Sequence, residues 1–144
     1  MTPVTDTRPN LDDIRAAHRR IEPYIHRTPV LSCRSIDAMV GAELYFKCEN
    51  FQKAGAFKTR GATNAVFLLS DEEAGHGVVT HSSGNHAAAL SLAGNWRSTP
   101  VRVVMPSNAP ELKQAPVRPY AGEITFCEPR IAARASTANR SMAA

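Results

Sequence analysis

Lys58 is the first residue of this sequence whose type and position could do chemistry. It begins a helical pattern, and the positions that share its predicted face are Ala62, Ala65, Val66 and Leu69. A lysine at the N-terminal end of a helix has its charge opposed by the helix dipole, which favours the neutral amine that condenses with an aldehyde. The alternative is a lysine whose side chain extends from the helix end into water.

The turn at residues 82–86 (SSGNH) is the second candidate. It joins a short apolar run to a helical pattern, and a strand, a glycine turn and a helix start together expose backbone N–H groups that bind anions. Ser82, Ser83 and Asn85 add short side-chain hydrogen-bonding groups. The alternative is a simple helix cap, because serine and asparagine are preferred at that position anyway.

Alternating strands and helices must position these two stretches. Strands are predicted at residues 43–48, 78–80, 101–105 and 123–127. Helices are predicted after Asn10, at 35–40 and 57–69, after the turn at 82–84, and after residue 107 or 108. This order predicts an α/β fold with a mainly parallel, twisted sheet and flanking helices.

Several residues predict where helices begin and end. Asn10 and Ser70 are predicted N-caps, and Gly41 is predicted to end the helix at 35–40. Ser107 or Asn108 is predicted to cap a later helix.

The end of the chain has a different composition. Residues 130–144 are rich in alanine and arginine with almost no apolar pattern, so no packed helix is predicted there and one sheet face is expected to lack its cover.

Composition excludes several classes of function. The chain is 43% hydrophobic and 21% charged, with a net charge of +4. It has no stripe of basic residues interleaved with aromatic residues, so nucleic-acid binding is not predicted. No apolar run could cross a membrane, and residues 1–13 are unlike a signal peptide. The histidines show no metal-ligand spacing, and three widely spaced cysteines (33, 48 and 127) predict buried, reduced thiols in a cytoplasmic protein.

Two motifs together resemble a known family. Residues 49–62 (ENFQKAGAFKTRGA) resemble the cofactor-lysine motif of fold-type II pyridoxal-phosphate enzymes, and residues 80–87 (THSSGNHA) resemble the substrate loop of the same family. The sequence is most similar to threonine dehydratases and serine racemases, over about residues 12–129. The resemblance implies a tryptophan synthase β-like fold, incomplete in this chain, of which residues 1–144 form the N-terminal part.

The resemblance also implies roles for individual residues. Lys58 would bind pyridoxal 5'-phosphate covalently and shuttle protons at the substrate α-carbon, Phe57 would flank the cofactor, and Asn85 would bond its phenolic oxygen. Ser82, Ser83, Asn85 and His86 would bind the substrate, a small hydroxy amino acid such as threonine or serine. In racemases, Ser83 would act on the substrate face opposite the lysine.

The sequence departs from the family pattern in ways that bear on activity. Ala56 stands where serine is usual, and neither the glycine-rich phosphate loop nor the late serine or cysteine that faces the pyridine nitrogen is present. The implied activity is that of a dehydratase or racemase scaffold, inactive as this chain alone. Alternatives are a non-catalytic remnant or another fold-type II enzyme. The resemblance also allows a homo-oligomer.

Overall fold

A three-stranded parallel sheet lies at the centre of the computed structural model, which describes residues 8–120 and 123–142. The strand order is β3 (Val78–Thr80), β4 (Val101–Pro106) and β5 (Glu123–Cys127). The middle strand pairs with both neighbours, so that Val103 lies opposite Thr80 on one side and Ile124 on the other. Three predicted strands are therefore confirmed, as is the α/β class with a mainly parallel sheet.

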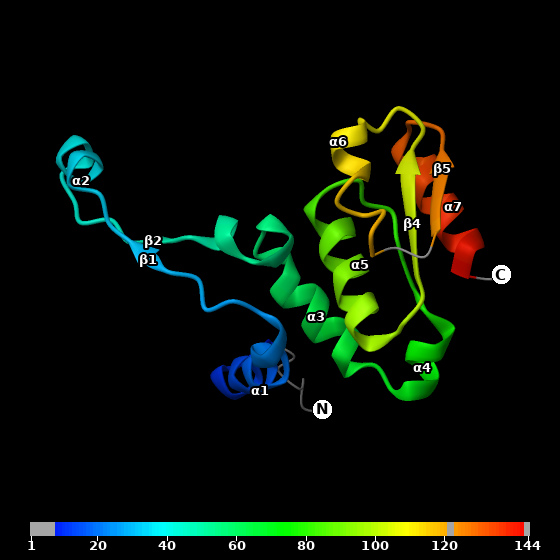
Figure 1. The fold of residues 1–144 in the computed structure, drawn as a ribbon, viewed down its shortest axis with the longest axis horizontal. Helices are drawn as coiled ribbons and strands as arrows, with labels where there is room; N and C mark the ends of the chain where they lie inside the picture. The colour runs from blue at the N-terminus through cyan, green and yellow to red at the C-terminus, as the bar shows by residue number, and fades with distance from the viewer. Residues whose placement is uncertain (1–7, 121–122, 143–144) are drawn as a thin grey trace, which may run out of the picture.

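Helices cover both faces of this sheet (Figure 1). On one face lies α5 (Asn85–Arg97), along which α3 (Lys58–Leu68) packs. A Cβ on Gly94 of α5 would lie 2.2 Å from Val101 Cγ2, so glycine is what allows α5 to approach β4 this closely. The core between these layers is built largely from alanine and valine.

The opposite face is covered by α7 (Ile131–Met142), in the segment for which no helix was predicted. That prediction is wrong because α7 packs through small side chains: Ala138 is buried, while its neighbours are polar or charged. An alanine-lined contact lacks the large apolar residues that make a helical period visible in a sequence.

The predicted helix ends are largely confirmed. Asn10 and Asp13 form a reciprocal capping box at the start of α1 (Leu11–Ile21), and Ser70 with Glu73 does the same for α4 (Asp71–His76). Gly41 ends α2 (Arg34–Val40) with a φ of 70°, a left-handed conformation that glycine adopts without strain. The turn Glu22–Tyr24 follows α1 directly.

Two local predictions are wrong. The helix α6 (Glu111–Gln114) begins directly after Pro110, and neither Ser107 nor Asn108 caps it. The strand predicted at 43–48 is reduced to β2 (Phe46–Lys47), because its antiparallel partner β1 (Val30–Leu31) is equally short.

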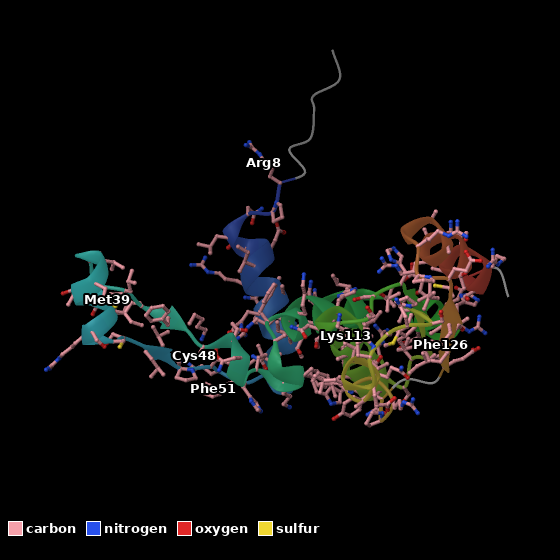
Figure 2. All side chains as sticks on the ribbon, turned by 90° about the horizontal axis from the view of Figure 1, so that it is seen from above. Arg8, Met39, Cys48, Phe51, Lys113 and Phe126 are labelled. Carbon is pink, nitrogen blue, oxygen red and sulfur yellow. The ribbon has the colours of Figure 1, made fainter. Side chains whose placement is uncertain are left out.

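Residues 25–48, here named the arm, extend away from the rest of the molecule, the body (Figures 1 and 2). The arm contains β1, α2 and β2, and the junction at residues 49–57 joins it to α3 through the turns Glu49–Phe51 and Lys53–Gly55. Figure 2 shows Met39 on the arm far from Phe126 on β5. The exposed large apolar residues of the arm are Val30, Leu31, Ile36, Met39, Val40, Tyr45 and Phe46.

Two further findings bear on the predictions from composition. None of the described helices combines the length and the apolarity that a membrane crossing requires. The three cysteines are free, as predicted, but each is only half-buried, so the prediction that they are buried is wrong.

Candidate functional site

Lys58 is the first residue of α3, and its side chain is exposed. Its Nζ lies 4.9 Å from the centroid of the Phe57 ring, which is itself 58% exposed. No side chain caps this helix start. The structure therefore presents an accessible amine beside an accessible aromatic ring, which are the two side chains assigned to the cofactor.

The buried face of α3 is shifted by about one residue from the predicted face. It consists of Thr59, Ala62, Thr63 and Val66. Lys58 and Ala65 are exposed, so their placement on the apolar face was wrong, and the face was misassigned because two of its members are threonines. Lys58 consequently lies outside the α3–α5 interface, where it can reach a ligand.

Residues 82–84 form a turn that leads into α5, as predicted, and Asn85 and His86 are the first residues of the helix. Ser82, Ser83 and Gly84 are half-buried, Asn85 and His86 are exposed, and Gly84 occupies the N-cap position. No side chain caps this helix, whereas α1 and α4 both have complete capping boxes. The simple side-chain cap that the residue types also allowed is therefore absent, and the first N–H groups of α5 are available to an anion.

The two candidate stretches lie at the same end of a helix pair. Arg97, the last residue of α5, donates hydrogen bonds to the carbonyl oxygens of Val66 and Leu69 at the C-terminal end of α3, the second at 2.6 Å. Because the C-terminal ends are joined and the helices pack along each other, α3 and α5 run in the same direction. Their N-terminal ends, with Lys58 and the loop at residues 82–86, therefore open on the same side of the body.

The remaining lysines have other surroundings. Lys47 Nζ donates a 2.6 Å hydrogen bond to the carbonyl oxygen of Thr28, and Lys53 Nζ lies 5.0 Å from the centroid of the Trp96 ring. Lys113 is exposed on α6. Lys58 is thus the lysine whose place in the fold suits a ligand held against the α5 N-terminus.

A network of polar side chains around Arg60 was not predicted from the sequence. The Arg60 guanidinium contacts both oxygens of Glu49 at 2.8 Å, and Thr28 Oγ1 donates to Glu49 at 2.6 Å. Hydrogen bonds from Arg60 and then from Thr28 lower the pKa of Glu49 to about 2. The signal available in the sequence was an acid and an arginine inside the lysine motif, on either side of Lys58.

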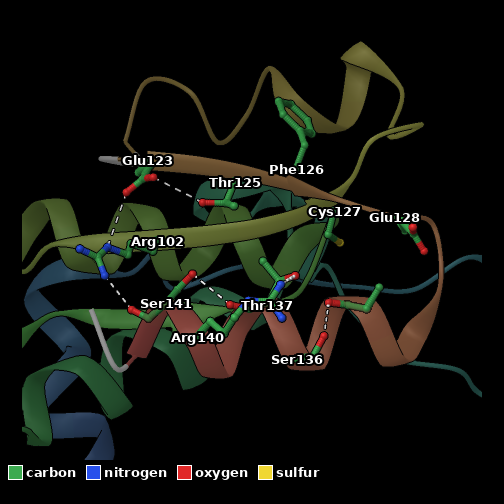
Figure 3. Close-up of a pocket in the computed structure, with 11 residues that line it drawn as sticks. Arg102, Glu123, Thr125, Phe126, Cys127, Glu128, Ser136, Thr137, Arg140 and Ser141 are labelled. Carbon is green, nitrogen blue, oxygen red and sulfur yellow. Dashed lines mark hydrogen bonds and ion pairs between the residues drawn. The ribbon is translucent and has the colours of Figure 1, made fainter.

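The structure also has a cavity of about 650 Å³ between β5 and α7, and none of the predicted site residues lines it (Figure 3). Its polar side chains are paired within the protein: Arg102 bonds the Ser141 carbonyl at 2.6 Å and Arg140 bonds Thr137 at 3.0 Å. The candidate site therefore remains at the starts of α3 and α5.

Comparisons with known proteins identify the family of the chain. Residues 21–144 match the model of the pyridoxal-phosphate dependent enzyme family. The chain is 56% identical over 131 residues to a serine racemase of Oryza sativa subsp. indica, and 54% identical over 129 residues to a β-hydroxyaspartate dehydratase of Paracoccus denitrificans. These matches cover 91% and 90% of this chain.

A solved structure shows the same fold. The structure of maize serine racemase superposes with a TM-score of 0.90 at 54% identity, covering 93% of this chain and 41% of the maize chain. The chain spans about two fifths of the length of the curated relatives that it matches, 39% and 41% for the rice and Paracoccus proteins. By its sequence match and its fold, the chain belongs to the pyridoxal-phosphate dependent enzyme family.

Proposed function

We propose that this chain carries the cofactor lysine and the substrate loop of an enzyme that racemises a small hydroxy amino acid or eliminates its β-hydroxyl. The observation that carries the proposal is the shared orientation of α3 and α5, which brings Lys58 and an uncapped helix N-terminus to one side of the body. The relatives named serine racemase and β-hydroxyaspartate dehydratase support this class of substrate.

The residues present fit one edge of pyridoxal phosphate. Its aldehyde needs an accessible amine, which Lys58 provides, and its phenolic oxygen needs a donor such as the Asn85 amide. The 144 residues contain no glycine-rich stretch for the phosphate group. When bound, the cofactor supplies the electron sink for bond breaking at the substrate α-carbon.

The protein's own groups then bind substrate and move protons. The N–H groups at the start of α5, with the Ser82 hydroxyl and His86, would bind the substrate carboxylate. Lys58 Nζ would take the α-proton from one face, and the Ser83 hydroxyl would serve the other face. In a family-length version of the protein, Ser83→Ala is expected to suppress racemisation more than elimination, and equal loss of both would restrict Ser83 to positioning substrate.

Reduction with borohydride tests the assignment of Lys58. The purified chain is mixed with excess pyridoxal phosphate, reduced, digested and mapped by mass spectrometry. Label is expected on Lys58 above the level found on the same residue in urea-unfolded chain, because the fold brings this amine to the same side of the body as the α5 N-terminus. Label on Lys53 or Lys47, with none on Lys58, would end the assignment.

We expect the 144 residues alone to show no turnover. Catalysis requires the cofactor to be held at both ends, and the groups found here hold one edge. The assay is release of ammonia and 2-oxo acid from serine, threonine and β-hydroxyaspartate with added cofactor. Turnover above that of a Lys58→Ala control would contradict this expectation.

A further inference from the structure

The ion pair between Glu49 and Arg60 is built more rigidly than a surface pair. Arg60 donates from Nε and Nη2 to separate oxygens of Glu49, both at 2.8 Å, and the two side chains are only 28% and 19% exposed. A two-pronged contact of this kind fixes direction as well as distance. Thr28, which is buried, adds a third hydrogen bond to the same carboxylate.

Thr59 makes a second connection beside it. Its side chain is fully buried, and its hydroxyl donates a 2.5 Å hydrogen bond to the carbonyl oxygen of Lys53. That bond holds the turn Lys53–Gly55, in which Ala54 has a φ of 55°, a conformation that is unfavourable for alanine.

These two connections join residues that lie before and after Lys58 in the sequence. The two residues that follow it, Thr59 and Arg60, are each bonded to a residue that precedes it, Lys53 and Glu49. Lys58 itself keeps an exposed side chain. Since α3 has no side-chain cap and uncapped helix ends fray, these bonds supply the order that the first turn would otherwise lack.

We propose that Glu49 and Arg60, assisted by Thr59, form a positioning clamp that fixes the start of α3, from which the Lys58 side chain extends. The proposal rests on the function proposed above, because it gives the amine a ligand to meet. A reacting group must be held by neighbours that are themselves locked, since small displacements reduce the rate at which it reacts. The clamp residues do not touch the ligand and act through Lys58.

The test compares two lysines within each sample of the full chain. The wild type, Glu49→Gln and Arg60→Gln are treated with pyridoxal phosphate and borohydride, and the label on Lys58 is divided by the label on Lys113, an exposed lysine on α6. The two variants are expected to lower this ratio by about threefold or more, because the helix start that carries the amine loses its fixed position. Circular dichroism verifies that each variant remains folded.

A matched control removes an equivalent contact from the other end of α3. Arg97 bonds the carbonyl oxygens of Val66 and Leu69, so Arg97→Gln disturbs the same helix at a distance from Lys58. Its Lys58 to Lys113 ratio is expected to equal that of the wild type. An equal fall in Arg97→Gln, Glu49→Gln and Arg60→Gln would show general loosening of α3 and overturn the clamp.

Thr59 provides a second pair of variants. Thr59→Val removes the hydroxyl and keeps the shape, so the ratio is expected to fall, and Thr59→Ser is expected to restore it. The clamp alone is overturned if the wild-type ratio exceeds that of urea-unfolded chain and stays unchanged in Glu49→Gln, Arg60→Gln and Thr59→Val. A wild-type ratio no higher than that of unfolded chain contradicts the proposed function, and the clamp fails with it.

Discussion

The body and the arm are held by different kinds of interaction. In the body, β4 is almost completely enclosed, and Val103, Val104 and Met105 have no exposed surface. In the arm, the large apolar side chains face outward, with Met39 at 84% and Tyr45 at 71% exposed. The body is thus stabilised by burial, whereas apolar burial contributes little to the arm.

Polar contacts hold the base of the arm instead. The buried Gln52 side chain bonds both the backbone N–H and the carbonyl of His26, at 2.9 and 2.8 Å, and Glu49 binds Arg60 beside it. Lys58 follows directly after this junction. The candidate site therefore lies at the boundary between these two regions. Polar bonds hold the junction that leads to Lys58, and apolar burial holds the body, which carries the helices of the site.

The largest expected effect is a difference in stability between substitutions of two methionines, one in the body and one in the arm. Met105→Ala should reduce the free energy of unfolding by about 3 kcal/mol, because it opens a cavity in the core. Met39→Ala on the arm should change it by less than about 0.5 kcal/mol. Urea unfolding measures both. Similar losses from the two substitutions would remove the distinction between body and arm.

Two glycines in helices of the body test how closely α5 packs against β4. Gly94→Ala places a methyl group against Val101 and the Thr99 carbonyl, so a loss of about 2 kcal/mol is expected. Gly75→Ala in α4 meets no atom within 4 Å and should be neutral or stabilising by about 0.5 kcal/mol. The claim of close α5–β4 packing fails if Gly94→Ala proves as harmless as its control.

Lowering the pH should weaken the ion pair between Glu49 and Arg60 at the junction. The pKa of Glu49 is lowered to about 2 in the folded chain, below the ordinary value for glutamate of about 4.3. Its contribution is therefore complete above about pH 5 and is lost as the pH falls towards about 2. Between about pH 6 and pH 3, the stability advantage of wild type over Glu49→Gln should shrink by about 2 kcal/mol. A constant difference in urea unfolding across that range would contradict the ion pair.

The smallest effect distinguishes two buried threonines of α3. Thr59→Val should cost about 1 kcal/mol, because it leaves the Lys53 carbonyl without its donor. Thr63 Oγ1 is buried without a partner among the described residues, so Thr63→Val should raise stability by about 0.5 kcal/mol. Opposite signs in thermal unfolding are the predicted result, and equal losses would mean that both hydroxyls are bonded.

The sequence predicted what local residue types determine. The three parallel strands follow from short runs of β-branched and apolar residues, and Asn10 and Ser70 cap their helices as their types require. The lysine and the loop at residues 82–86 were identified from motifs whose order matches the elements found.

Features that depend on tertiary contacts were missed. The helix α7 is buried through alanine, so no apolar period shows it, and the buried face of α3 includes threonines that their residue type places outside. The Glu49–Arg60 pair joins residues whose contact depends on the path of the junction. Its chemistry was visible in the sequence, but its geometry was not.

The most direct test of the central claim is the visible spectrum of the chain titrated with pyridoxal phosphate. If Lys58 is the cofactor lysine, the wild type should develop a saturable absorbance band, distinct from that of free cofactor, and Lys58→Ala should lack it at the same concentrations. Lys53→Ala, which removes the lysine beside Trp96, should retain the band and serves as the control. A band of equal strength in wild type and Lys58→Ala would contradict the assignment of the site.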